Sequence, residues 1–351
     1  MRRIDAGLPV QAIWSRGQYM LAQFRHQIAM ILIPLLVILA WEEAVRSLGP
    51  QLVPGLASNP QALLIVIGAG CVFLVAPVMI RHIWDTTSLP DGHLRQRLLS
   101  MCRHYRVGFR ELLLWRTFGG MINAAVMGVF APVRYILLTD ALLEMLPQDQ
   151  VEAVMAHELA HIKKHHLFWL LVVAIGMLGA FQLVWIPLAA IAAAMTTDSI
   201  LLPASAITWL SDDQTMAVAG TVAILGCWLP AFGWVSRRFE RQADTFAVLH
   251  MARQQAKAAA FTETTGTIQR SNALIMTQAL HHVADLNSIA LHRRSWRHGS
   301  IAWRQGYLRD LVGQPIGKLA IDSQVQWIKI ASALTFGLVI AIEVGLIGVV
   351  W

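Results

Sequence analysis

The sequence has few charged residues. Aspartate, glutamate, lysine and arginine make up only 14% of its 351 residues, while 56% are hydrophobic and the mean hydropathy is +0.54. Soluble globular domains carry about 25% charged residues. The composition therefore argues against an ordinary soluble enzyme and indicates an integral membrane protein.

Cysteine is also scarce. Its three positions, Cys71, Cys102 and Cys227, form no CxxC pair, and two of them lie in apolar runs. We therefore expect neither a disulfide framework nor cysteine as a metal ligand. A cleavable signal peptide is not expected either, because no small-residue cleavage site follows an early apolar core.

Long apolar runs, in contrast, are abundant. Five of them approach or exceed the ~20 residues that cross a bilayer core. The first contains Pro34 and ends in two glutamates, so it either crosses the membrane or lies on its surface. The five candidate spans are residues 27–45, 62–80, 167–195, 215–235 and 330–351.

The basic residues are unevenly distributed. Segments 1–27, 81–166 and 236–327 carry 4, 10 and 12 Lys or Arg residues, which is 26 of the 28 in the chain. With five crossings these segments fall on one face of the membrane, and basic segments mark the cytoplasmic face. Topology thus explains the net charge of +7. We expect no nucleic-acid partner, and the basic face favours anionic lipid head groups.

One polar stretch carries a recognisable chemical pattern. Val151–His166 reads VEAVMAHELAHIKKHH and contains His157, Glu158 and His161. On a helix, residues four apart share a face, so the two imidazoles lie side by side. Two such histidines are typical of a catalytic zinc site, in which the glutamate takes a proton from a water molecule. The alternative is two histidines on an ordinary amphipathic helix. His165 is expected to be part of an interfacial anchor.

A second pattern follows the fourth apolar run without a break, so we expect one helix to continue out of the membrane. Glu240 and Asp244 lie four apart in SRRFERQAD and share a helix face. A zinc site with two histidines needs a third protein ligand, for which Glu240 is the candidate. Asp244 could accept a hydrogen bond from a ligand imidazole. The alternative is that both carboxylates pair with the neighbouring arginines.

The region before the histidines predicts a small sheet. Residues 81–106 read as helical, and three short strands are expected at Glu111–Phe118, Met121–Phe130 and Arg134–Thr139. We therefore divide the chain into two membrane-spanning parts (1–80 and 167–235), two parts of one catalytic domain (81–166 and 236–327) and a C-terminal span (328–351).

HELAHIKKHH, followed after two spans by SRRFERQADTFA, resembles the membrane zinc metallopeptidases of the CAAX prenyl protease 1 and HtpX family. The stretch NAAVMGVFAPVRYILLTDALLEML resembles that family too, and the resemblance covers about residues 105–310. It implies a gluzincin site in which His157, His161 and Glu240 hold one Zn²⁺ per chain. Glu158 would be the general base, and Asp244 would orient a zinc ligand without binding the metal itself.

A further resemblance lies at His298-Gly299-Ser300-Ile301-Ala302-Trp303-Arg304. The CAAX relatives have His-Pro with an arginine six residues after the histidine. Here the spacing is kept, but Gly299 replaces the proline. The resemblance implies that His298 is catalytic and stabilises the oxyanion, with Arg304 nearby. The alternative is that His298 belongs to a basic surface cluster. Three other histidines match no motif: His281, His282 and His292.

The expected fold is a mainly α-helical integral membrane protein with about five transmembrane helices. A cytoplasmic α+β zincin-type metalloprotease domain would carry the small β-sheet. The resemblance implies that an extended peptide or membrane-protein substrate lies along the strand around 121–126, with Asn123 positioning its backbone.

The expected function is a membrane-embedded zinc metalloendopeptidase of a bacterial inner membrane, acting in membrane-protein quality control or processing. The alternatives are a CAAX-type processing protease and a non-catalytic zinc-stabilised scaffold, which would have no need of Glu158. An intramembrane site-2-type protease is disfavoured, because charged residues flank the motif on both sides: Asp149, Glu152, Lys163 and Lys164.

Overall fold

The structure, a computed structural model, describes residues 15–52, 58–118, 120–197, 213–258 and 266–349. The chain forms two compact units. The first combines Met1–Lys163 with Gln278–Ile289, and the second combines Lys164–Thr277 with Ala290–Trp351. Residues 196–214, which carry Asp198, Asp212 and Asp213 between the third and fourth apolar runs, lie almost wholly outside the described residues.

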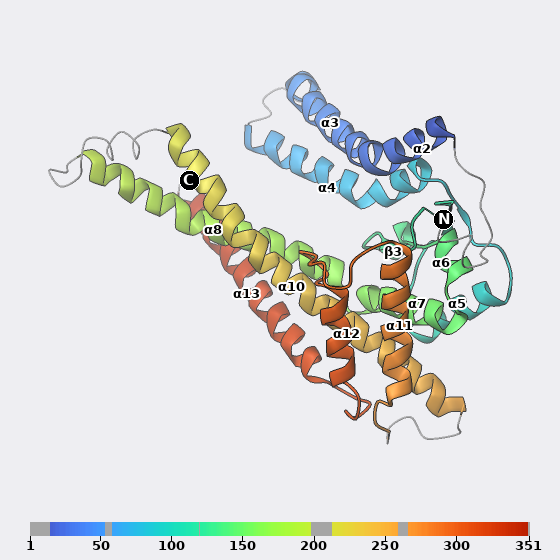
Figure 1. The fold of residues 1–351 in the computed structure, drawn as a ribbon. Coiled ribbons are helices and arrows are strands. Elements are labelled where there is room, and N and C mark those ends of the chain that lie inside the picture. The colour runs from blue at the N-terminus through green and yellow to red at the C-terminus, as the bar shows by residue number, and fades with distance from the viewer. Residues whose placement is uncertain (1–14, 53–57, 119, 198–212, 259–265, 350–351) are drawn as a thin grey trace. The chain divides into compact units, whose positions relative to one another are not determined.

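The first unit begins with a helical hairpin (Figure 1). A capping box at Ser15 starts helix α2. Helices α3 and α4 then pack against each other. Trp41 of α3 donates from Nε1 to the Leu64 carbonyl at 2.9 Å, and its ring occupies the place that a side chain at Gly68 would need. The helical elements of the hairpin are α2 (Arg16–Gln23), the π-helical turn η1 (Phe24–Ala29), α3 (Met30–Leu52) and α4 (Ser58–Ile83).

A four-stranded mixed sheet follows, in the order β1-β2-β4-β3. Its strands are β1 (Thr86–Ser88), β2 (Glu111–Trp115), β3 (Ala124–Met127) and β4 (Tyr135–Thr139). Strands β2 and β4 are parallel, and the two outer strands run antiparallel to their neighbours. Every residue of β4 is buried, as its apolar sequence YILLT requires of a central strand. Strand β3 lies at an edge of the sheet.

The three strands expected from the sequence are therefore present but shorter. The fourth, β1, falls within the segment 81–106 that was expected to be helical, so that expectation was wrong at this point. The reason is tertiary: the three residues TTS carry no alternating pattern and become a strand by pairing with the end of β2.

The rest of the first unit is helical. Thr139, the last residue of β4, caps α6 by accepting a hydrogen bond from the Leu142 amide. Helix α7 packs against β3, α5 and α6. The C-terminal part of α11 belongs to the same unit. These elements are α5 (His93–His104), the 3₁₀ turn η2 (Ala131–Val133), α6 (Asp140–Met145), α7 (Gln148–Lys163) and α11 (Arg270–Leu286).

The second unit contains three long helices that contact one another: α8, α10 and α13. Helix α10 runs without a break from the fourth apolar stretch into the polar segment that carries Glu240, as expected. Gly176 and Gly179 of α8 lie against Phe336 and Val339 of α13, which allows a close approach of the two backbones. The helices of this unit are α8 (His166–Thr197), α10 (Asp213–Ala258), α12 (Ile301–Asp310) and α13 (Ala320–Val349).

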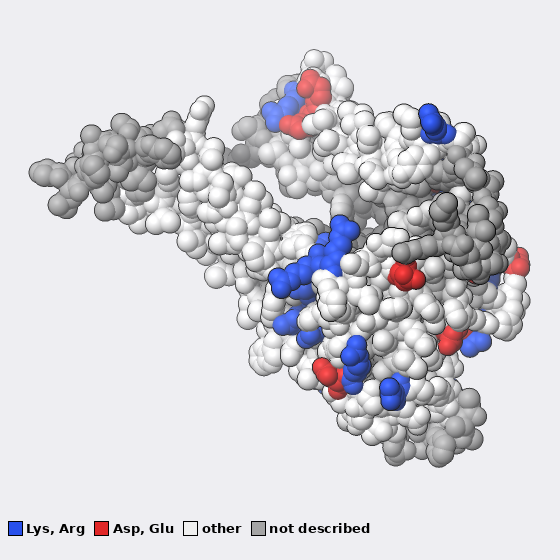
Figure 2. All heavy atoms as spheres, viewed as in Figure 1, with Lys and Arg blue, Asp and Glu red and all other residues white. Residues whose placement is uncertain are grey.

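Among the described residues, five helices are long and apolar enough to cross a membrane, which confirms the number expected from the sequence. They are Arg16–Gly49, Gln61–Ile83, His166–Ile191, Gln214–Lys257 and Ala320–Ile342. On the face drawn in Figure 2, the described parts of α8 and α10 towards the left of the view show no charged atoms. The chain is thus an integral membrane protein with a small mixed sheet.

Candidate metal centre

Helix α7 positions the first two candidate ligands. Pro147 precedes the helix, and Asp149 in its first turn suits the positive end of the helix dipole. His157 is buried, and His161 one turn later is half-buried. The helix is fixed through apolar residues that are almost completely buried: Val151, Ala153, Met155, Ala156, Leu159 and Ala160. The two histidines therefore project from a backbone that the core of the first unit holds in place.

The two imidazoles face each other through the same ring atom. The Nε2 atoms of His157 and His161 lie 3.2 Å apart, with the ring planes inclined at 70°. For a tetrahedral ion with metal–nitrogen bonds of about 2.0–2.1 Å, two ligand nitrogens lie about 3.3 Å apart. The observed separation therefore matches one edge of such a tetrahedron.

Helix α7 is also held by side chains around it. Glu152 is 1% exposed and accepts from Nη2 of Arg97 at 3.0 Å. Burial raises the pKa of the Glu152 carboxyl, and the nearby Arg97 guanidinium opposes that rise. On α11, Nδ1 of His282 lies 2.7 Å from Oε1 of Gln150. His282 is thus a packing residue of α7, consistent with its lack of a motif.

Helix α10 carries the two carboxylates. Glu240 and Asp244 are 4% and 0% exposed, and buried carboxylates need compensating partners. Arg304 of α12 donates to both oxygens of Asp244, from Nε at 2.8 Å and from Nη2 at 2.6 Å. Its Nη1 lies 3.4 Å from Oε2 of Glu240. One buried guanidinium from 60 residues further along the chain therefore serves both carboxylates.

This arrangement bears on the alternative that neighbouring arginines on α10 neutralise the carboxylates. Nη1 of Arg237 donates to the Trp296 carbonyl at 2.7 Å. The guanidinium of Arg241 stacks on the ring of Trp303, 3.8 Å from its centroid. Asp244 and Glu240 both form ion pairs with Arg304, and Arg241 also interacts electrostatically with Asp244.

His298 lies beside Glu240 in the same unit. Its Nδ1 is 2.9 Å from Oε1 of Glu240, and its side chain is 54% exposed. Gly299, which follows it, has φ = +76°. Proline, whose φ is locked near −65°, cannot adopt that conformation. Glycine permits this backbone conformation, and the turn brings His298 to Glu240.

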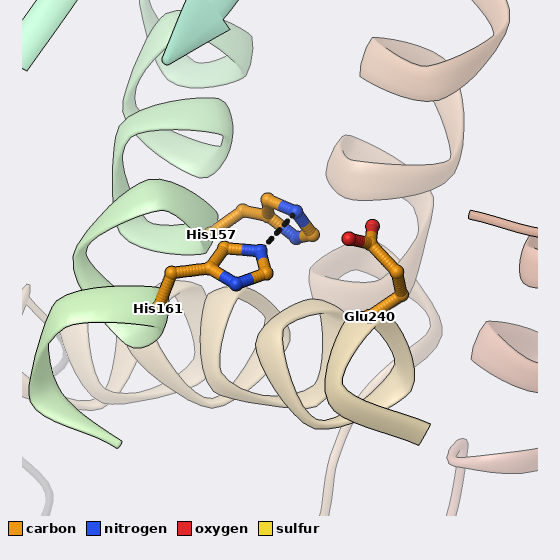
Figure 3. Close-up of side chains that lie close together, drawn as sticks. All are labelled: His157, His161 and Glu240. Carbon is orange, nitrogen blue, oxygen red and sulfur yellow. Dashed lines mark hydrogen bonds between the residues drawn. The ribbon is translucent and has the colours of Figure 1, made fainter. Parts of the chain in front are cut away.

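Figure 3 shows His157, His161 and Glu240 together. One ligand-capable atom from each lies within 4.8 Å of the others. Two imidazole nitrogens and a carboxylate oxygen are a donor set that holds a divalent metal ion and leaves a fourth position open. The residues present fit such an ion.

Glu158, Asn123 and His165 are further residues that the sequence singled out. Glu158 is half-buried on α7, directly after His157. Asn123 is exposed just before β3, and its backbone amide donates to Oγ1 of Thr139 at 3.0 Å. His165 is exposed in the turn between α7 and α8, with φ = +55°. His166 is fully buried and lies 2.9 Å through Nε2 from Oε1 of Gln242.

One supporting residue had no signal in the sequence. The side-chain amide of Asn287 accepts from the Ile122 amide at 3.0 Å and donates to the Ile122 carbonyl at 2.9 Å. It thereby fixes the chain just before the edge strand β3. Asn287 lies 165 residues from Ile122 and belongs to no motif, so that only the fold identifies it.

The five apolar helices and the His–His–Glu group define an integral membrane protein of the metallopeptidase class. Comparison with known families narrows this assignment. The profile described as Peptidase family M48 matches residues 90–292, which is more than half of the chain. The protein therefore belongs to peptidase family M48, whose members are metallopeptidases and generally zinc-dependent.

Two individual relatives are also similar. The CAAX prenyl protease 1 homolog of Arabidopsis thaliana is 27% identical over 188 residues, which are 50% of this chain and 41% of that protein. The match thus spans less than half the length of that relative. The crystal structure of S. mikatae Ste24p is 16% identical, with a TM-score of 0.49, and the superposition covers 84% of this chain and 66% of that one.

Proposed function

We propose that this protein is a zinc metalloendopeptidase that holds one Zn²⁺ through His157, His161 and Glu240. The observation that supports this most is the grouping of the three ligand atoms within 4.8 Å. The separation of 3.2 Å between the two Nε2 atoms agrees with it. When bound, zinc supplies Lewis-acid catalysis and lowers the pKa of water at the open position.

The side chains around the ion have separate roles in this proposal. Glu158 takes the proton of the attacking water and delivers it to the leaving amine. His298 donates to the oxyanion that develops on the scissile carbonyl. Arg304 and Asp244 act as positioning residues, because Arg304 contacts both Asp244 and Glu240 and so fixes the orientation of the Glu240 carboxylate.

The edge strand β3 is the proposed substrate-binding element. It lies at one end of the sheet order, and α7, which carries the histidines, packs against it. An extended peptide that pairs with such an edge is bound through its backbone, with little demand on its side chains. The exposed Asn123, just before β3, would hydrogen-bond that backbone. This mode of binding suits a protease that acts on many membrane-protein segments.

The proposed role is quality control or processing of membrane proteins. A second candidate is the processing of CAAX-type prenylated proteins, favoured by the printed name of the Arabidopsis relative. A purely structural zinc site is less consistent with the chain, because it gives no role to Glu158. The two enzymatic candidates differ in substrate and share the same centre.

The test uses Glu158→Gln and Glu240→Ala, each compared with the wild-type chain. Glu158→Gln should keep about one zinc per chain and lose hydrolysis of a quenched fluorescent peptide by roughly 10²–10⁴-fold, the range for a general acid–base group. Glu240→Ala should lose most of its zinc. If Glu240→Ala binds zinc as tightly as the wild type, the assignment of the third ligand is wrong. Proteins trapped by Glu158→Gln in native membranes would separate the two substrate classes.

We place the centre on the cytoplasmic face of a bacterial inner membrane. The support is the concentration of 26 of 28 basic residues in three segments that five crossings bring to one side. A reporter inserted at Gly266 should then be cytoplasmic, and one placed after Trp351 should be external. An external reporter at Gly266 would contradict the proposed orientation. It would not bear on the proposed zinc site.

A further inference from the structure

The second unit contains a cavity of about 390 Å³ where α8, α10 and α13 meet. It is lined by Lys164 just before α8, by the polar part of α10 and by the first turns of α13 with the segment before them. Glu240 and Asp244 are not among its lining residues. The cavity is therefore a feature separate from the carboxylate cluster.

The charge around this cavity is strongly positive. Its lining contains one acidic residue, Asp322. It also contains four basic residues: Lys164, Arg253, Lys318 and Lys329. Asp322 is already engaged, because its Oδ1 lies 3.1 Å from Nζ of Lys164 and accepts from Gln242 at 2.7 Å. Three formal positive charges remain in excess, and a concave site lined by one sign of charge concentrates the opposite ion.

Two of the four cations are held in place by the fold. Nζ of Lys329 donates to the Lys164 carbonyl at 2.6 Å, and Lys164 is fixed by its pair with Asp322. Arg253 on α10 is half-buried, and Lys318 just before α13 is exposed. The cavity thus has a preorganised basic wall and a more open basic side. This geometry suits the several oxygens of a phosphate group.

The surroundings indicate where such a phosphate comes from. Trp327 on α13 is 70% exposed, and the ring of Trp169 on α8 lies 5.7 Å from Nζ of Lys329. Exposed tryptophans mark the level of lipid head groups. Immediately beyond them along α8 and α13, the two helices expose large apolar side chains, among them Leu171 and Leu334. The cavity therefore lies where the polar surface gives way to the membrane-facing surface.

We propose that this cavity binds the phosphate of an anionic phospholipid, whose acyl chains lie along the apolar faces of α8 and α13. Basic pockets between membrane helices are suited to such head groups. Binding would hold Lys164, the polar part of α10 and the first turns of α13 around one ligand. It would thereby stabilise α10, which carries Glu240 two residues before the lining residue Gln242. The proposal does not depend on the metal or on the proposed peptidase activity.

The experiment measures phosphatidylglycerol retained by the purified full-length chain in native mass spectrometry, with phosphatidylcholine as the uncharged comparison. The test variant is Arg253→Gln combined with Lys318→Gln, which leaves the hydrogen-bonded pair Lys164 and Lys329 intact. The matched control is Arg270→Gln combined with Arg309→Gln, which removes the same charge from exposed positions of the same unit that do not line the cavity.

The test variant should bind phosphatidylglycerol about 30-fold more weakly, at roughly five-fold for each basic residue removed, while the control stays within about two-fold of the wild type. Phosphatidylglycerol should also raise the thermal midpoint of the wild type and the control, and less so that of the test variant. Equal lipid binding by both double variants would overturn the proposal. Stabilisation by inorganic phosphate alone, with no effect of phosphatidylglycerol, would overturn the lipid source.

Discussion

The histidine pair on α7 and the carboxylate pair on α10 have the same spacing, yet they depend on the rest of the chain to different degrees. His157 and His161 face each other because residues four apart on a helix always do. Glu240 and Asp244 are also four apart, but both are almost completely buried charges. Their position in the second unit depends on Arg304, which α12 brings from 60 residues further along the chain. A local rule is enough for the first pair, whereas the second needs a tertiary partner.

The largest effect that this comparison predicts is a loss of stability when the guanidinium of Arg304 is removed. Arg304→Met keeps the length of the side chain but takes the guanidinium from two buried carboxylates. Breaking a buried ion pair in this way costs about 3–5 kcal/mol. We therefore expect the free energy of unfolding, measured by SDS titration in mixed micelles, to fall by that amount.

Arg309→Met is the matched control for this experiment, because Arg309 lies on the same helix and is exposed. It should change the free energy of unfolding by no more than about 0.5 kcal/mol. If the two variants unfold alike, the carboxylates of α10 do not depend on Arg304, and the contrast with the histidine pair fails.

A smaller effect is expected at His298, and it sharpens the comparison because His298 contacts one of the two carboxylates. If His298 stabilises the oxyanion, its interaction is stronger in the transition state than in the ground state. His298→Ala should then lower kcat about 100-fold and leave zinc content and KM nearly unchanged. The measurement is peptide hydrolysis with zinc determined in the same samples.

The separation of 2.9 Å between His298 Nδ1 and Glu240 Oε1 suggests a second role for His298, which predicts a different result for His298→Ala. A residue that only orients a ligand carboxylate would lower zinc affinity 10–100-fold when removed. If His298→Ala loses zinc but has a normal kcat once zinc is restored, then the role of His298 is to orient Glu240. The metal alone would then stabilise the oxyanion.

The smallest effect concerns the first unit, in which α7 packs against the edge strand β3. Asn287→Ala removes both hydrogen bonds to the backbone of the buried Ile122. Leaving such a buried group unsatisfied costs about 1–3 kcal/mol, so the free energy of unfolding should fall by that amount. A rise in KM for peptide should accompany it, because Asn287 fixes the chain before the proposed substrate strand.

Asn123→Ala provides the comparison for Asn287→Ala. Its side chain is exposed, so stability should change by no more than about 0.5 kcal/mol. If Asn123 positions the substrate backbone, KM alone should rise. An unchanged KM in both variants would remove β3 from the substrate-binding proposal.

Much of this protein could be predicted from its sequence because the signals are local. The number of membrane-crossing helices follows from the length and polarity of five apolar runs. The pairing of His157 with His161 follows from helix geometry, and β4 follows from its short apolar run YILLT, which contains β-branched and aromatic residues. Strand β1 could not be predicted, since three residues become a strand only by pairing with β2.

The tertiary structure decided the features whose partners lie far apart in the chain. It paired Arg304 with both carboxylates, because α12 buries this side chain against α10. It brought Asn287 to Ile122 across 165 residues. It also gathered Lys164, Arg253 and Lys329 around one cavity. Sequence spacing determines which side chains share a helix face, whereas the packing of helices determines what those faces meet.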